Sequence, residues 1–176
     1  MTGRTRTRFL VGLVAFALAL MATVGASAHD GHGDGDRDGM KVSQANATFS
    51  SSLAPSQTTD PVIDGAAPGG LPWVIDRGTV RLQANGRVRV ELEGLVIPIA
   101  HGTFPAGTAR PVTTVSASVR CALGASATTA AVPISEDGDA RIDDTVDLPS
   151  TCLAPVVLVH PNGGAGAYIA VSGWRP

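Results

Sequence analysis

The residues best suited to chemistry in this sequence are four histidines and two cysteines. The histidines stand at positions 29, 32, 101 and 160, and the cysteines at positions 121 and 152. Imidazole and thiol groups serve in metal binding, acid–base catalysis and disulfide formation, depending on their spacing and compartment. The sequence contains no HExxH, paired-cysteine zinc or Gly-x-Ser-x-Gly motif, so spacing alone indicates neither a zinc site nor a catalytic nucleophile.

His29 and His32 follow a segment typical of a secretory signal peptide, so its removal places them at a new amino terminus. Cleavage after Ala28 makes His29 the first residue, where its amine and imidazole chelate copper together. Cleavage after Ala26 makes it the third, and the amine, two amides and the imidazole then bind Cu(II) in a square plane. A solvated tail with incidental affinity is the alternative, and the sequence leaves both open.

The signal peptide is predicted over residues 1–28. Arg4, Arg6 and Arg8 supply the positive start, residues 9–24 are an apolar run, and the small residues 26–28 form the cleavage region. The run of 16 residues is shorter than the roughly 20 that cross a bilayer. The sequence therefore predicts a secreted, extracellular protein with no membrane association after the signal is removed.

Cys121 and Cys152 are predicted to form a disulfide. An even number of cysteines in an exported chain favours pairing, and neither lies in a short motif with a second cysteine or histidine. On the chain-entropy model, a disulfide that closes a loop of about 32 residues stabilises the fold by roughly 3.5–4 kcal/mol. We expect this bond to be structural.

The charge balance excludes several kinds of partner. The chain carries 13 basic and 15 acidic residues, a net charge of −2. Loss of the three signal-peptide arginines leaves ten basic residues and a net charge of −5. Nucleic acid is therefore not an expected partner. We expect a monomer whose partner is an extracellular or cell-surface protein that the sequence does not identify.

Composition divides the exported chain into two parts. Residues 29–40 are mostly Asp, Gly and His, and residues 41–70 are rich in Ser, Thr, Ala, Pro and Gly. Such segments bury too little apolar surface to offset chain entropy, so residues 29–70 are predicted to be a disordered linker. Residues 47–53 remain able to pair with a sheet edge. Residues 71–176 are predicted to be the folded domain.

The clearest strand pattern in that domain lies in residues 79–93, where apolar and charged residues alternate with a period of two. A three-residue loop of Ala84, Asn85 and Gly86 pairs Leu82 with Val88, and it places Gly86 in a left-handed conformation. A two-residue loop would instead put a core residue and a charge on one face. We therefore predict a hairpin with the first register, in which two arginines, 81 and 89, face each other.

Further alternating or continuously apolar segments predict strands at residues 115–121, 127–134, 140–148, 156–160 and 168–172. Proline and glycine mark the loops between them, and no exported segment shows a helical period. Seven to eight strands in about 100 residues predict an all-β fold, an immunoglobulin-like antiparallel β-sandwich.

Three residues are candidates for a binding surface. His101 lies in a loop rich in Gly and Pro, His160 ends an apolar strand, and Trp174 lies two residues from the end of the sequence. Exposed aromatic residues supply much of the energy at binding surfaces. The two histidines also allow a small hydrolase, with an acid–base partner drawn from the aspartates at 137, 139, 143 and 144.

Two stretches, LPWVIDRGTVRLQANGRVRVELEGLVIP and LPSTCLAPVVLVHPNGG, resemble the small secreted proteins of actinobacteria that carry a single two-cysteine β-domain. The resemblance covers residues 70–173 and implies the fold but no activity. The sequence as a whole therefore predicts a secreted binding or structural module without enzymatic activity. An extracellular copper-binding protein is the alternative.

Overall fold

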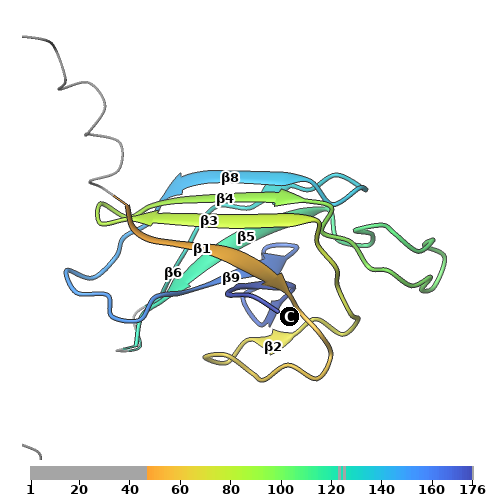
Figure 1. Ribbon diagram of the computed structural model, residues 1–176, viewed down its shortest axis with the longest axis horizontal. Coiled ribbons are helices and arrows are strands. Elements are labelled where there is room, and N and C mark those ends of the chain that lie inside the picture. Colours follow the sequence, from red (N-terminus) through yellow and green to blue (C-terminus); the bar gives the residue numbers. More distant parts are fainter. Residues whose placement is uncertain (1–46, 123, 125, 176) are drawn as a thin grey trace, which may run out of the picture. The chain divides into compact units, whose positions relative to one another are not determined.

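The computed structural model describes residues 47–122, 124 and 126–175, and in this part of the chain every regular element is a β-strand (Figure 1). The strands are β1 (Ala47–Pro55), β2 (Ala67–Pro68), β3 (Arg77–Gln83), β4 (Arg87–Glu93), β5 (Thr114–Arg120), β6 (Ser126–Thr128), β7 (Val132–Pro133), β8 (Ala140–Thr145), β9 (Val156–Pro161), β10 (Ala167–Tyr168) and β11 (Ala170–Ser172). The predicted all-β class is confirmed.

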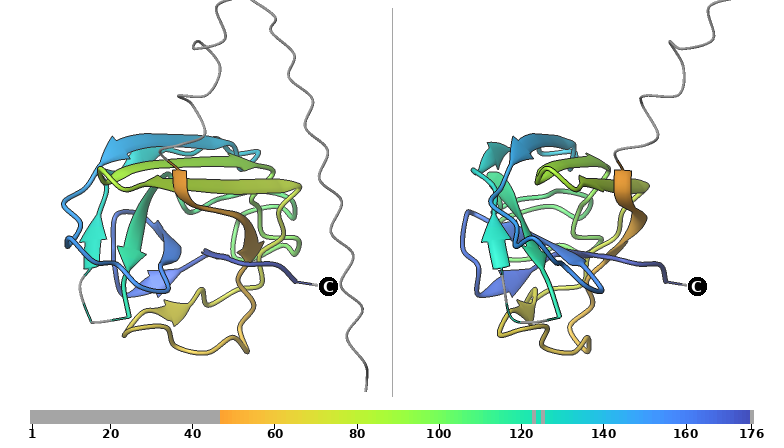
Figure 2. Two further views of the ribbon diagram at one scale, coloured as in Figure 1. Left: turned by 60° about the vertical axis from the view of Figure 1, so that its left-hand side comes forward. Right: turned by 90° about the vertical axis from the view of Figure 1, so that its left-hand side faces the viewer.

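The main sheet is antiparallel and has the order β6-β5-β9-β11-β1-β3-β4-β8, with β7 also on β5. Strand β1 joins its two halves because residues 47–52 pair with β3 and residues 53–55 pair with β11. The sheet curls at this strand, so that the half containing β3, β4 and β8 faces the half containing β5 and β9 (Figure 2). Contacts of β8 with β5 and β7 bring the far ends of the sheet together.

The core lies between these two halves. Alternate residues of β3, β4 and β8 point inward, including Val80, Val90 and Ile142. Alternate residues of β5 and β9, including Val119 and Val159, meet them from the opposite side. Burial of such side chains contributes about 1.5–3 kcal/mol each, so this apolar layer is the main force that holds the halves together.

The predicted hairpin and its register are confirmed. Leu82 pairs with Val88, and Arg81 faces Arg89. Gly86 has a φ of +83°, and an added Cβ there would collide with the carbonyl oxygen of Val146. Glycine is therefore required at this position both by the backbone conformation and by the close approach of the neighbouring chain.

The predicted linker boundary at residue 70 differs from the structure, since residues 47–70 contain β1 and β2. Residues 47–52 pair with β3 and residues 53–55 pair with β11, so this segment pairs with the domain, as expected for residues 47–53, and links the two halves of the sheet. Its inward-facing Leu53 is only 4% exposed. The composition of this segment predicted a linker, but pairing with distant strands places it in the sheet. The described domain therefore begins at residue 47. Residues 29–46 lie outside the described residues.

The remaining predicted strands are present with three changes. The strand expected at residues 140–148 ends at Thr145, and the segment expected at residues 168–172 is divided into β10 and β11. Strand β9 lies between β5 and β11, as its continuously apolar sequence indicates. The segment expected at residues 127–134 is two strands, β6 and β7, both paired with β5. Thr129 lies between them, where its backbone N–H donates to Ala117 O and its Oγ1 accepts from Ala117 N–H. These local bonds take the place of a continuous ladder.

The outward face of β5 and β9 is covered by residues 57–70, which we call the cover segment. Its strand β2 pairs in parallel with β10. Ala66 of the cover segment packs with Leu158 and Tyr168 in a second, smaller apolar cluster. The half of the sheet containing β5 and β9 is therefore buried on both faces.

Candidate functional site

The predicted disulfide between Cys121 and Cys152 is present, with its two Cα atoms 5.0 Å apart. Cys121 directly follows β5, and Cys152 precedes β9 in the chain. Because β5 and β9 are paired neighbours, the bond joins two segments of the same half of the sheet. Both sulfurs are committed to this bond, so neither is a thiol nucleophile or a thiolate ligand.

His160 lies on β9 beneath the cover segment and has no exposed surface. Its Nδ1 donates to the carbonyl oxygen of Ala167 at 2.6 Å, because that oxygen can only accept. Its Nε2 lies 2.7 Å from Ser118 Oγ, so in the neutral ring the hydroxyl donates to it. Burial lowers the pKa of His160 from its usual 6.5, and the nearby Arg120 lowers it further, against the opposing effect of the Ala167 bond.

The Ser118–His160 pair continues to the surface through two more residues. Arg120 Nε donates to Ser118 Oγ at 3.2 Å, and Arg120 Nη1 lies 3.0 Å from Asp64 Oδ2 of the cover segment. A serine bonded to a histidine is the arrangement of many nucleophilic sites. Ser118 is fully buried as well, however, so neither side chain is accessible to a substrate, and the pair acts as internal hydrogen bonding.

His101 occupies a different part of the fold, in the loop between β4 and β5. It forms a bridge with Phe104, and their ring centroids are 5.6 Å apart. Its Nδ1 lies 3.1 Å from Ile99 O and its Nε2 lies 2.7 Å from Arg110 O. Each ring nitrogen of His101 therefore faces a backbone oxygen of the same loop.

The structure does not bring the candidate residues together. No contact links His101, His160 and Trp174 in the described ranges, and His160 cannot contribute to a surface because the cover segment buries it. Three of the four aspartates considered as acid–base partners have other contacts, and the fourth, Asp137, is exposed. Asp143 accepts from two arginines of β4, and Asp144 Oδ2 accepts from Ala130 N–H. Asp139 Oδ1 accepts from Gly94 N–H.

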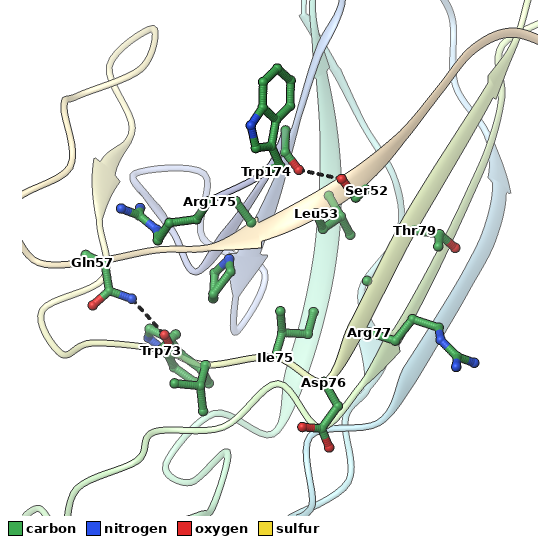
Figure 3. Close-up of a pocket in the computed structure, with 15 residues that line it drawn as sticks. Ser52, Leu53, Gln57, Trp73, Ile75, Asp76, Arg77, Thr79, Trp174 and Arg175 are labelled. Atoms are coloured by element: carbon green, nitrogen blue, oxygen red, sulfur yellow. Dashed lines mark hydrogen bonds between the residues drawn. The ribbon is translucent and has the colours of Figure 1, made fainter.

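The described surface contains an open groove of about 700 Å³, which we call the β1 groove. Strand β1 from Ser52 to Pro55 runs along it. Residues 73–79 line one side and residues 173–175 line the other (Figure 3). The groove opens where β1 leaves β3 to pair with β11, because the last β1–β3 pair is Ser52 with Thr79.

Hydrogen bonds fix both sides of the β1 groove. Ser52 Oγ donates to Gly173 O at 2.7 Å, and Gln57 Nε2 donates to Trp73 O at 2.8 Å. Arg175 Nη2 donates to both carboxylate oxygens of Asp60. Burial alone would raise the pKa of Asp60, but its bonds to the Gln57 N–H and to Arg175 outweigh that effect and lower it.

The lining of the β1 groove combines apolar and charged groups. Trp174 is 85% exposed and Val74 is 42% exposed, so large apolar surfaces face solvent on both sides. Asp76 is exposed beside them, and Arg77 forms a 3.4 Å ion pair with the exposed Glu93. The groove therefore offers an indole, a carboxylate and a guanidinium to a ligand without any rearrangement of the core.

The predicted copper ligands His29 and His32 lie outside the described residues. Among residues 47–122, 124 and 126–175, no cluster of three or more His, Cys, Asp or Glu side chains has an arrangement that holds a metal ion. The same part of the chain contains no helix long and apolar enough to cross a membrane.

Comparisons with protein-family models, with curated proteins and with solved structures gave no match to this chain. The functional argument therefore depends on the geometry of its own residues.

Sequence reasoning missed two features. It predicted the strand at residues 115–121 but not that its polar face, with Ser116, Ser118 and Arg120, is covered, because alternation does not distinguish a face open to water from one that another segment covers. It also missed the β1 groove, whose walls come from segments about 100 residues apart in the chain. The exposure of Trp174 near the end of the sequence was the only local signal of that groove.

Proposed function

We propose that this protein is secreted and acts outside the cell as a non-enzymatic binding module that contacts a partner protein through the β1 groove. The observation that carries the proposal is the exposed indole of Trp174 at the side of a groove that also presents charged groups. Tryptophan and arginine are enriched among the residues that dominate binding energy at protein interfaces. An open, shallow groove also suits a protein surface better than an enclosed small-molecule site.

The signal-peptide pattern of residues 1–28 supports export, and the Cys121–Cys152 disulfide is typical of oxidising compartments. The test is mass spectrometry of the culture medium of the producing cells. We expect a mature chain that starts at Ser27 or His29. Recovery of the protein only inside the cells, with residues 1–28 intact, would contradict export.

The binding proposal is tested by sedimentation of labelled protein with washed, intact producing cells, before and after protease treatment of the cell surface. We expect saturable binding that protease abolishes and that Trp174→Ala weakens about tenfold or more, as for a central interface tryptophan. Leu153→Ala is the matched control, because Leu153 is 57% exposed but lies outside the groove. Equal binding by wild type and Trp174→Ala would reject the groove as the contact site.

The finer fold prediction, an immunoglobulin-like sandwich, remains a proposal. Two antiparallel halves that face each other across one core support it. The disulfide differs from the pattern of antibody domains, where the bond joins the two sheets, because here it joins segments of one half. An experimental structure that shows two separate sheets with immunoglobulin strand order would decide the point.

Copper binding at the mature amino terminus is the second candidate function, and the position of His29 directly after the predicted cleavage region favours it. Copper titration of the mature protein, with His29→Ala as control, tests it. Equal copper affinity of the wild type and His29→Ala would exclude this candidate.

A further inference from the structure

The outward face of β1, β3, β4 and β8 carries one row of side chains that crosses all four strands. In the pairing registers, Ser50 lies opposite Arg81, Arg81 lies opposite Arg89, and Arg89 lies opposite Asp143. Arg87 lies two residues before Arg89 on β4 and therefore shares its face of the sheet. We call Arg81, Arg87 and Arg89 the arginine cluster.

The arginine cluster has too few carboxylates to balance it. Arg87 and Arg89 both donate to Asp143, with nitrogen–oxygen distances of 2.8–3.2 Å. Arg81 is exposed, and its guanidinium has no ion-pair or hydrogen-bond partner among the described residues. Two of the three guanidinium groups thus share one carboxylate and the third contacts none, although the chain as a whole has a net charge of −2.

The neighbouring charges on the same face are balanced one to one. Arg141 pairs with Glu91 at 2.9 Å, and Arg77 pairs with Glu93 at 3.4 Å. Like charges directly opposite each other on adjacent strands are destabilising, so the Arg81–Arg89 pair is unfavourable in the free protein. An anion placed between these two guanidinium groups would remove that repulsion.

We propose that the arginine cluster is a binding site for an anionic polysaccharide, whose sulfate or carboxylate groups bridge Arg81 and Arg89. Arginine forms forked hydrogen bonds with such planar or tetrahedral anions. The hydroxyl of Ser50 lies in the same row and is exposed to the hydroxyl groups of a sugar. The inference does not rest on the β1 groove, because none of the arginine cluster lines that groove.

The composition of this face favours a polysaccharide over other polyanions. The large apolar side chains that are exposed in the described residues are Val62, Val74, Ile99, Leu153 and Trp174. None belongs to β1, β3, β4 or β8, so the face has no apolar group to insert into a lipid surface. It also has no exposed aromatic ring on which bases of a single-stranded nucleic acid stack.

The test is calorimetric titration of the folded protein with a heparin decasaccharide, with neutral dextran of equal length and with polyphosphate of equal charge. We expect heparin to bind and dextran not to bind. Arg81→Gln should weaken heparin binding about tenfold, because it removes the guanidinium that has no protein partner. Arg141→Gln is the matched control. It removes the same charge from the same sheet face, so it should change the affinity by less than about twofold.

Three results would overturn the proposal. Equal weakening by Arg81→Gln and Arg141→Gln would show general charge attraction rather than a site. Polyphosphate binding tighter than heparin would exclude a polysaccharide as the preferred ligand, and absence of heparin binding would exclude the site altogether. Arg81→Gln removes a like-charge pair, so its thermal unfolding should match or exceed that of the wild type, and loss of fold does not confuse the result.

Discussion

The two halves of the curled sheet both contain strands with alternating sequences, β3 and β4 on one half and β5 on the other, but their outward faces differ. On β3 and β4 the polar residues between core positions face water, as at Arg81 and Glu91. On β5 and β9 the corresponding polar residues Ser116, Ser118 and His160 are buried beneath the cover segment. We call these the open half and the covered half.

This difference shows what a polar residue needs in each setting. On the open half, charged side chains contact one another in exposed pairs, which contribute little stability and remain available to ligands. On the covered half, Ser118 and His160 satisfy each other internally, because a buried polar group without a partner is costly. We therefore expect the covered half to determine stability and the open half to be free for binding.

The largest expected effect is loss of the disulfide in the covered half. The double variant Cys121→Ser/Cys152→Ser should lower the free energy of unfolding by about 3.5–4 kcal/mol, because the unfolded chain regains the freedom of a loop of about 32 residues. Urea unfolding measures this difference. Dithiothreitol should destabilise the wild type by a similar amount and leave the double variant unchanged. A loss no greater than that of an exposed substitution would contradict the structural role of the bond.

An intermediate effect is expected at Ser118. Ser118→Ala leaves His160 Nε2 without its hydroxyl donor inside the protein, which should lower the free energy of unfolding by about 1–3 kcal/mol. Ser50→Ala, an equal change on the open half, should stay within about 0.5 kcal/mol of the wild type. Both are measured by urea unfolding. Equal losses at the two positions would remove the distinction between the halves.

The smallest effect is a difference in pH dependence. Burial lowers the pKa of His160 from 6.5, so the unfolded chain takes up a proton at a pH where the folded protein does not. This contribution to stability is complete above pH 6.5. It falls as the pH drops below that value toward the folded pKa, by at most about 1.4 kcal/mol per pH unit.

On the open half, hydrogen bonds from Arg87 and then Arg89 lower the pKa of Asp143 from 3.8 to about 2. Its contribution is present above pH 3.8 and is lost as the pH falls toward 2. NMR titration of the His160 ring and the Asp143 carboxyl carbon, together with urea unfolding across this range, checks both windows. A His160 midpoint at or above 6.5 would contradict the assigned burial.

The features of the two halves that depend on neighbouring residues could be predicted from the sequence. The β3–β4 register followed from the loop length and from keeping Leu82 and Val88 on one face. The sequence predicted that Arg81 faces Arg89, but it did not predict the ion pair of Arg89 with Asp143, which forms because β8 pairs with β4. The candidate site was predicted only at Trp174, since its other walls come from distant segments.

The sequence by itself determined the strand periods, the three-residue turn at Gly86 and the pairing of two cysteines, because each depends on neighbouring residues or on a choice with one solution. Only the tertiary structure decided that residues 47–55 join the two halves, that His160 is covered and that Arg87 and Arg89 share one carboxylate. These outcomes depend on which distant segment lies against each strand. Period-two alternation specifies the two faces of a strand but does not specify what covers them.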